Sequence, residues 1–218
     1  MHLLGGIPGA PLRTSGEPPL LQVTGEGRAQ AAPDKVEISL GFTARAPQAA
    51  EAFNQVSQAI NRVVAALLQA GVQREQLQTE QISLTPVFDE QQRLTGYEAT
   101  SILRVTLRNV SAAGTIIDRA VSAGANRVQE IRFDLTDPAP LAAAALERAV
   151  QDANRQAAVL ARSLGVRLGP VFRVVAEPAG GPIVPVFARA AAAEVIPVLP
   201  GNITITRTIR VDYVISSM

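Results

Sequence analysis

Several segments of the chain alternate apolar with polar side chains, which predicts β-strands. Val36, Ile38 and Leu40 are separated by single residues, and this period of two is typical of a half-buried strand. The same alternation runs through residues 203–215 at the end of the chain. Further strands are predicted for residues 20–27, 82–88, 97–107, 128–135 and 171–176.

Three other segments repeat apolar residues every three or four positions, which predicts amphipathic helices. The first runs from Pro47 to a stop at Gly71, and the second from Ser111, as the expected N-cap, to Gly124. The third and longest begins after Asp137, ends at Gly165 and presents a stripe of alanine and leucine. Small residues along a helix permit close approach to a sheet.

Helices and hairpins are mixed in this order rather than strictly alternating, which favours an α+β fold with a largely antiparallel sheet covered by helices on one face. Residues 1–19 are rich in glycine and proline and are predicted to be a disordered leader. Residues 20–218 are predicted to form a single domain. Within it, Gly25-Glu26-Gly27 is expected to be a structural turn or bulge, because it lacks the spacing of a phosphate-binding loop.

Composition removes several functional classes. Cysteine is absent, and the one histidine is His2, so thiol chemistry, histidine general bases and histidine metal ligands are not expected. Twenty basic and nineteen acidic residues nearly cancel, which argues against binding of nucleic acid. No run reaches the roughly 18 apolar residues of a membrane-spanning helix. We therefore expect no catalytic residues, no cofactor and no bound metal; Glu26 and Asp34 are the closest candidate carboxylate pair, and Asp34 suits an ordinary turn.

Two surfaces are candidates for contacts with other proteins. The first is a basic sheet face, because five arginines lie on predicted strands, often on the face opposite the apolar one: Arg104, Arg108, Arg132, Arg207 and Arg210. Neighbouring acids can partly neutralise it, so the choice is between a solvated face with ion pairs and a face that meets an acidic partner or a second copy.

The second candidate is residues 178–200, a proline-rich insertion that is strongly apolar. Such a long apolar excursion has to be covered either by the chain's own core or by a neighbouring subunit, and we favour the subunit interface. The residues expected to form this interface are Ile183, Val184, Val186, Phe187, Val195, Ile196, Val198 and Leu199.

Several blocks of sequence resemble the SIMPL-domain family, also called DUF541, in the expected order over roughly residues 20–216. They include VTGEGRAQAAPDKVEISLGF, GYEATSILRVTLRN, GANRVQEIRFDLTDP and PGNITITRTIRVDYVIS. The resemblance implies bacterial proteins that are mostly exported to the envelope or periplasm, some of which form large ring- or channel-like homo-oligomers. It also implies links to oxidative-stress tolerance and, in a vertebrate relative, a role as a kinase-binding adaptor. It supplies no catalytic residues.

The sequence therefore favours a non-enzymatic envelope protein that acts by homo-oligomeric assembly or as an adaptor for a protein partner. The alternative is a protein that binds a small molecule or ion in a cleft between sheet and helices. The first residues lack a charged region followed by an apolar stretch, so a cytoplasmic location stays open beside the periplasmic one.

Overall fold

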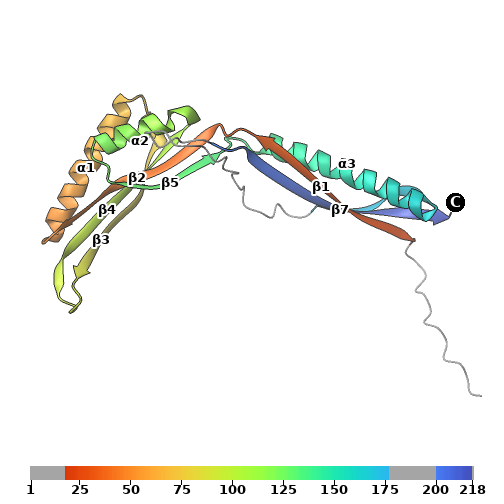
Figure 1. Cartoon of the computed structure of the whole chain (residues 1–218), viewed down its shortest axis with the longest axis horizontal. Helices are drawn as coiled ribbons and strands as arrows, with labels where there is room; N and C mark the ends of the chain where they lie inside the picture. The colour runs from red at the N-terminus through yellow and green to blue at the C-terminus, as the bar shows by residue number, and fades with distance from the viewer. Residues whose placement is uncertain (1–17, 177–199, 218) are drawn as a thin grey trace, which may run out of the picture. The chain divides into compact units, whose positions relative to one another are not determined.

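The computed structural model describes residues 18–176 and 200–217. These residues form three α-helices and seven strands in two antiparallel sheets, which confirms the predicted α+β class. Figure 1 shows the elements in chain order. Their bounds are β1 Leu20–Ala31, β2 Lys35–Ala46, α1 Ala49–Gln69, β3 Leu77–Phe88, β4 Leu94–Leu107, α2 Ala113–Ser122, β5 Arg127–Asp134, α3 Ala139–Leu164, β6 Val166–Ala176 and β7 Ile203–Ser217, with short 3₁₀ turns at Arg74–Gln76 and Val110–Ala112.

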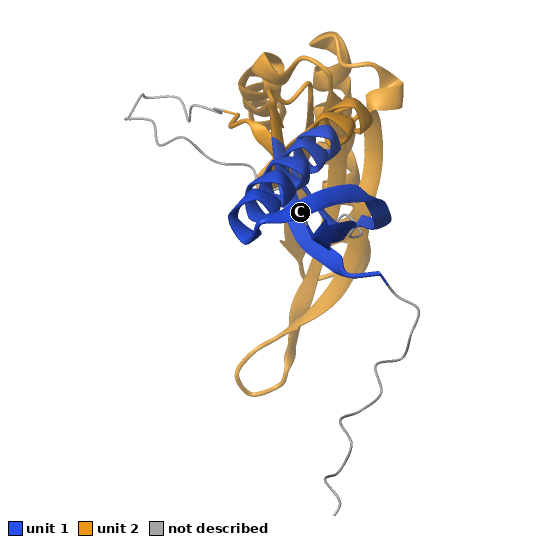
Figure 2. Cartoon of the chain, turned by 90° about the vertical axis from the view of Figure 1, so that its right-hand side faces the viewer, with its two compact units in different colours: residues 1–28, 145–180, 206–218 blue, residues 29–144, 181–205 orange. Residues whose placement is uncertain are grey.

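Contacts within the chain divide it into two compact units, coloured separately in Figure 2. Unit 1 holds β1 up to Arg28, α3 from Ala145 onward, β6, and β7 from Thr206 onward. Unit 2 holds the four strands and two helices between Ala29 and Ala144. The boundary of a single domain at residues 20–218 stays a prediction.

Unit 2 is a four-stranded sheet in the order β3-β4-β2-β5, with α1 and α2 on one face (Figure 1). In β2, Val36, Ile38 and Leu40 point to the helices and are fully buried. They lie opposite Leu107, Val105 and Leu103 of β4 and pack under α1 residues such as Val63 and Leu67. The predicted alternation in this strand is therefore the core face of the sheet.

Glycines end all three helices, as predicted. Gly71 and Gly124 adopt positive φ angles of 91° and 113°, and the next residue in each case donates its backbone N–H to a carbonyl five positions back, in Leu67 and Ala120. Gly165 also has a positive φ. Asp137 accepts a hydrogen bond from Ala139 at the start of α3, as expected.

The predicted N-cap at Ser111 is wrong. The N-cap of α2 is Ala112, and the side chain of Asn109 instead caps the 3₁₀ turn before the helix, where it accepts hydrogen bonds from the backbone N–H and the hydroxyl of Ser111. A 3₁₀ turn at Val110–Ala112 precedes α2. Asn and Ser are both strong capping residues, so composition alone did not separate them.

Unit 1 is a three-stranded sheet in the order β1-β7-β6, with α3 alongside β1 and β7 (Figure 1). The helix contributes a stripe of buried alanines, and the strands contribute Val23, Ile209, Val211 and Tyr213. The Tyr213 hydroxyl donates a hydrogen bond to Asn154 of α3, and burial raises the pKa of Tyr213.

The predicted turn at Gly25-Glu26-Gly27 is also wrong, because β1 continues through it to Ala31. A Cβ atom on Gly25 would overlap the carbonyl oxygen of Ala149, and one on Gly27 would overlap that of Ala145. The two glycines therefore serve close approach of helix to strand rather than a change of chain direction.

Candidate functional site

The face of the unit 2 sheet opposite the helices carries charged and hydroxyl side chains. The strand register places Arg104 beside Ser39 and Arg132 beside Glu37, so these two predicted arginines share this face. Arg108 lies just beyond the end of β4 and is exposed. Arg207 and Arg210 belong to unit 1, where their odd and even positions place them on opposite sides of β7.

Most charges on this face are paired. Arg104 contacts Glu80 at 2.5 Å, and the Ser39 hydroxyl donates to the other Glu80 oxygen at 2.6 Å. These hydrogen bonds, from Ser39 first and then Arg104, hold the pKa of Glu80 below its usual value. Arg132 similarly contacts Glu130 at 2.9 Å. Ionised Glu80 is therefore a poor proton donor near neutral pH.

Lys35, at the start of β2, forms the last group of ion pairs on this face. Its ammonium group lies 3.2 Å from Glu37 and 3.4 Å from Asp134. Burial opposes the charge on Lys35, but the two carboxylates outweigh that effect and raise its pKa.

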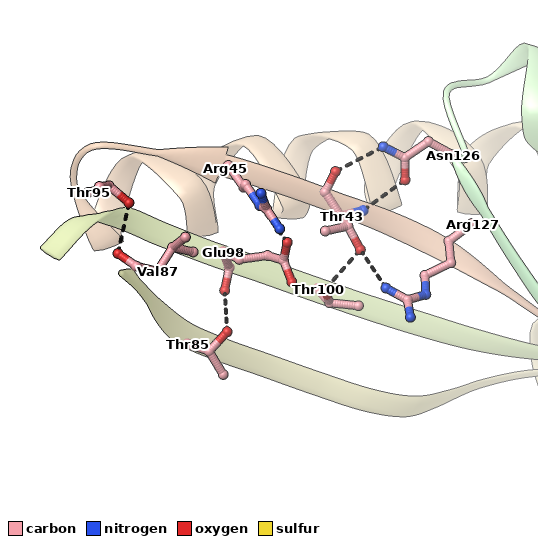
Figure 3. Close-up of polar contacts among 9 residues, drawn as sticks. All are labelled: Thr43, Arg45, Thr85, Val87, Thr95, Glu98, Thr100, Asn126 and Arg127. Carbon is pink, nitrogen blue, oxygen red and sulfur yellow. Dashed lines mark hydrogen bonds and ion pairs between the residues drawn. The ribbon is translucent and has the colours of Figure 1, made fainter. Parts of the chain in front are cut away.

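A polar pocket of about 470 Å³ lies farther along the same strands, where β5 begins. β5 pairs with β2 only as far as Gly41 and Arg127, whereas β2 and β4 continue together to Ala46 and Tyr97. The corner left by the shorter strand is drawn in Figure 3. The pocket is lined by Thr43, Ala44, Arg45, Glu98, Asn126 and Arg127.

Asn126, the residue before β5, makes the hydrogen bonds to β2 that a longer β5 would make. Its backbone N–H donates to the carbonyl of Gly41 at 3.0 Å. Its side-chain oxygen accepts from the backbone N–H of Thr43, and its side-chain nitrogen donates to the carbonyl of Thr43, both at 2.9 Å (Figure 3). The amide thus satisfies both backbone groups of Thr43 that β5 would otherwise pair.

Side chains above the sheet complete the pocket. The Thr43 and Thr100 hydroxyls lie 2.8 Å apart, and Arg45 forms an ion pair with Glu98 at 2.7 Å (Figure 3). Arg127 reaches over Thr43 with a long hydrogen bond of 3.5 Å to its hydroxyl. Within the described ranges, Arg127 has no carboxylate partner.

A buried carboxylate organises the face of unit 1 that is opposite α3. Asp212 accepts hydrogen bonds from Gln22 of β1 at 2.7 Å and from Arg173 of β6 at 2.8 Å, and so ties both outer strands to β7. These two partners, Gln22 first, lower the pKa of Asp212. The Asp212 side chain is only 4% exposed, whereas that of Arg173 is 59% exposed.

The two edges of the unit 1 sheet differ. On β1, side chains of α3 take the outward backbone groups: Asp152 accepts from the N–H of Glu26 at 3.1 Å, and Arg148 donates to the carbonyl of Arg28. On β6, no described strand pairs with the outer edge. Four large apolar side chains there are about half exposed: Val171 (51%), Phe172 (48%), Val174 (54%) and Val175 (45%).

The other predicted site residues do not gather in these places. The eight residues expected at a subunit interface, between Ile183 and Leu199, lie outside the described residues. Glu26 belongs to unit 1 and pairs with Arg28, while Asp34 belongs to unit 2 and accepts from the N–H of Thr136. Among described residues no cluster of three or more carboxylate or histidine side chains could hold a metal ion.

Sequence comparison finds a family match over nearly the whole chain. Residues 21–213 match the SIMPL family, which is described as a protein of unknown function (DUF541). The chain belongs to the SIMPL family. The match to SIMPL proteins includes both units, the pocket beside Asn126 and the exposed edge of β6.

Similar SIMPL proteins come from several bacteria. The 26 kDa periplasmic immunogenic protein of Brucella melitensis is 31% identical over 166 residues, which cover 72% of this chain and 66% of that protein. An uncharacterised protein, YggE, is 28% identical in Edwardsiella ictaluri and 26% identical in Escherichia coli K12, over 72% of this chain and 68% or 65% of those proteins. The match with the Brucella protein thus spans slightly less than two thirds of its length.

None of the described helices is both long and apolar enough to cross a membrane.

Sequence reasoning missed Asn126, Arg127 and Asn109 as organising residues. An asparagine two residues after the helix-ending Gly124 and directly before a strand was the available signal for Asn126.

Proposed function

We propose that this SIMPL protein is a non-enzymatic component of the bacterial periplasm that works by assembling with copies of itself. The observation that carries the proposal is the exposed apolar edge of β6. The periplasmic part rests on the printed name of the Brucella relative. A role as an adaptor, or in stress tolerance, would follow from such an assembly.

The β6 edge combines two properties that favour pairing with another chain. Its outward backbone groups face no described strand, and its side chains are apolar on both sides of the sheet. From Arg173 to Ala176 the strand pairs regularly with β7, so this part is a straight template. Burying the exposed halves of the four large side chains would contribute roughly 3–6 kcal/mol per copy before entropy is subtracted.

Other sheet edges are protected, which makes β6 the best candidate. α3 covers part of the β1 edge, as described above. The β5 edge carries Arg132 and Glu130, and charged side chains discourage strand addition. β3 has a bulge at Glu80 and a proline at position 86, which interrupt a continuous ladder. β6 also has irregular pairing and Pro170, but these precede its regular stretch from Arg173 to Ala176.

β3 nevertheless offers a second, weaker apolar surface. Ile82 and Leu84 lie on the helix side of the sheet, yet they are 61% and 43% exposed. Two different apolar edges on one chain permit a head-to-tail contact, which closes into a ring or continues as a filament.

The decisive experiment is the mass in solution by multi-angle light scattering over a dilution series of the full chain. We expect the wild-type protein to be several times heavier than the 22.9 kDa monomer. Val174→Lys places a charge on the β6 edge and should shift the protein towards the monomer. Val121→Lys in α2 is the matched control, because Val121 is 50% exposed, much like Val174 at 54%.

A wild-type protein that is monomeric at every concentration would refute assembly. Assembly that survives Val174→Lys and Val175→Lys would move the interface away from β6. Circular dichroism of each variant shows whether it has folded.

A further inference from the structure

The polar pocket beside Asn126 has no part in the proposed self-assembly through β6, so its role needs a separate account. Its position follows from where β5 begins, at Arg127 opposite Gly41, and its shape is held by the two hydrogen bonds between the Asn126 amide and the backbone of Thr43. The floor is the rigid pair of β2 and β4, where Thr100 is buried. The pocket has a volume of about 470 Å³ and is open to solvent.

The charges in this pocket do not balance. Arg45 is neutralised by Glu98 at 2.7 Å, which leaves Arg127 as a further positive charge. In the described part of the chain, Arg127 has one hydrogen bond, the 3.5 Å contact to the Thr43 hydroxyl. By contrast, Arg104 and Arg132 on the same sheet each contact a carboxylate at 2.9 Å or less.

The hydrogen-bonding groups around Arg127 favour an acceptor as the ligand. Both side-chain atoms of Asn126 are already used, so its amide cannot turn to offer a different group. The Thr43 and Thr100 hydroxyls bond to each other, and one of their two hydrogens stays available to a ligand oxygen. A guanidinium presents parallel N–H groups that match two oxygens of one carboxylate or phosphate.

We propose that this pocket binds an oxyanion, the carboxylate or phosphate group of a small ligand, with Arg127 as its principal contact. The Thr43–Thr100 hydroxyl pair would supply a further hydrogen bond, and the Arg45–Glu98 pair would border the rest of the ligand. This binding site lies on the open face of the sheet, not in the cleft between sheet and helices that the sequence suggested. It is independent of the β6 edge.

The test is isothermal titration calorimetry of the full chain at low ionic strength with two probes, inorganic phosphate and succinate. We expect saturable binding of at least one of them, with an affinity that falls as salt is added. Arg127→Gln should weaken binding by about tenfold or more, because a charge-assisted contact is lost. Arg127→Lys keeps the charge but loses the planar fork, so it should restore only part of the affinity.

Arg108→Gln is the matched control, because Arg108 is an exposed arginine at the end of β4 and lies outside the pocket lining. It removes the same charge and should leave binding unchanged. The Val174→Lys variant should bind as the wild type does, which separates this proposal from that of assembly. The stronger probe distinguishes a phosphate group from a carboxylate as the natural ligand.

Two results would overturn the proposal. One is the absence of saturable binding for both probes. The other is an equal loss in Arg127→Gln and Arg108→Gln, which would mean that the probes respond to overall charge as adventitious ions only.

Discussion

The two sheets of this protein each carry a helix on one face, but the helices are packed by opposite means. Under α1, branched side chains fill the space, with Ile38, Leu40 and Leu67 fully buried. Under α3, alanines at every fourth position, such as Ala149 and Ala153, lie against a strand that contains glycine. In unit 2, large side chains fill the space between helix and sheet. In unit 1, the backbones of α3 and β1 lie so close together that little space is left to fill.

Because of this difference, unit 1 should tolerate shortened side chains better than lengthened ones, and unit 2 should be sensitive to shortened ones. A core of large side chains loses stability when a side chain is shortened, because a cavity remains. Where glycine packs against alanine, there is almost no side chain to shorten, so stability cannot be lost in that way. An added methyl group at such a contact would instead overlap neighbouring atoms and lower the stability. Substitutions of each kind in each unit therefore test the comparison directly.

The largest expected effect is that of Ile38→Ala in unit 2. Ile38 is fully buried between Val105 and Ile131 in the middle of the sheet. We expect the free energy of unfolding to fall by about 3–4 kcal/mol, measured by urea denaturation. Val121→Ala is the control, because Val121 is half exposed and should change little. A loss below about 1 kcal/mol for Ile38→Ala would contradict a bulk-filled core.

Gly27→Ala in unit 1 should have the next largest effect. The added Cβ would collide with the backbone of Ala145 and Ala149, which cannot rotate away as a flexible side chain could. Displacing α3 should cost about 2–3 kcal/mol of unfolding free energy, again measured in urea.

Gly114→Ala provides the matched control, because a Cβ at Gly114 would meet no other atom within 4 Å. Gly114 lies in α2, where alanine is a better helix former, so this variant should gain about 0.5 kcal/mol. If Gly27→Ala also proved neutral, the helix could not be as close to β1 as the structure has it.

The sequence predicted the elements of both units but not their mode of packing. Alternation along β2 and β7 and the glycines after each helix placed strands and helix ends well, because these signals are local. Gly25 and Gly27 were interpreted as a turn, since glycine in isolation favours one. Only the partner helix, more than a hundred residues away, shows that these glycines provide space instead.

The candidate sites were harder to predict for the same reason. Arg104 and Arg132 were expected on one sheet face, and the register places them there. The pocket beside Asn126 depends on where β5 begins relative to β2, and alternation of apolar and polar residues does not define where a strand begins. The apolar segment VFRVVA predicted the strand β6. Only the strand order β1-β7-β6 shows that this strand lies at the edge of its sheet.

The smallest expected effect compares the open faces of the two sheets. Glu80 in unit 2 and Asp212 in unit 1 both have lowered pKa values, but only the Asp212 side chain is almost fully buried, at 4% exposed. Because Gln22 and Arg173 bind its ionised form, the folded state holds a proton on Asp212 less readily than the unfolded chain. Its contribution to stability is therefore complete above the ordinary pKa of an aspartate and is lost as the pH falls through the lower folded value.

Asp212→Asn removes this contribution while keeping the size of the side chain. We expect a modest loss of stability near neutral pH, smaller than that of Gly27→Ala, and a shallower decline on acidification than the wild type shows. Urea midpoints at about pH 7 and about pH 3 measure both quantities. Glu26→Gln is the control, because Glu26 forms an ion pair with Arg28 in which both side chains are largely exposed to solvent, and it should not alter the slope. Identical pH profiles for Asp212→Asn and the wild type would show that the Asp212 carboxylate makes no pH-dependent contribution to the stability of unit 1.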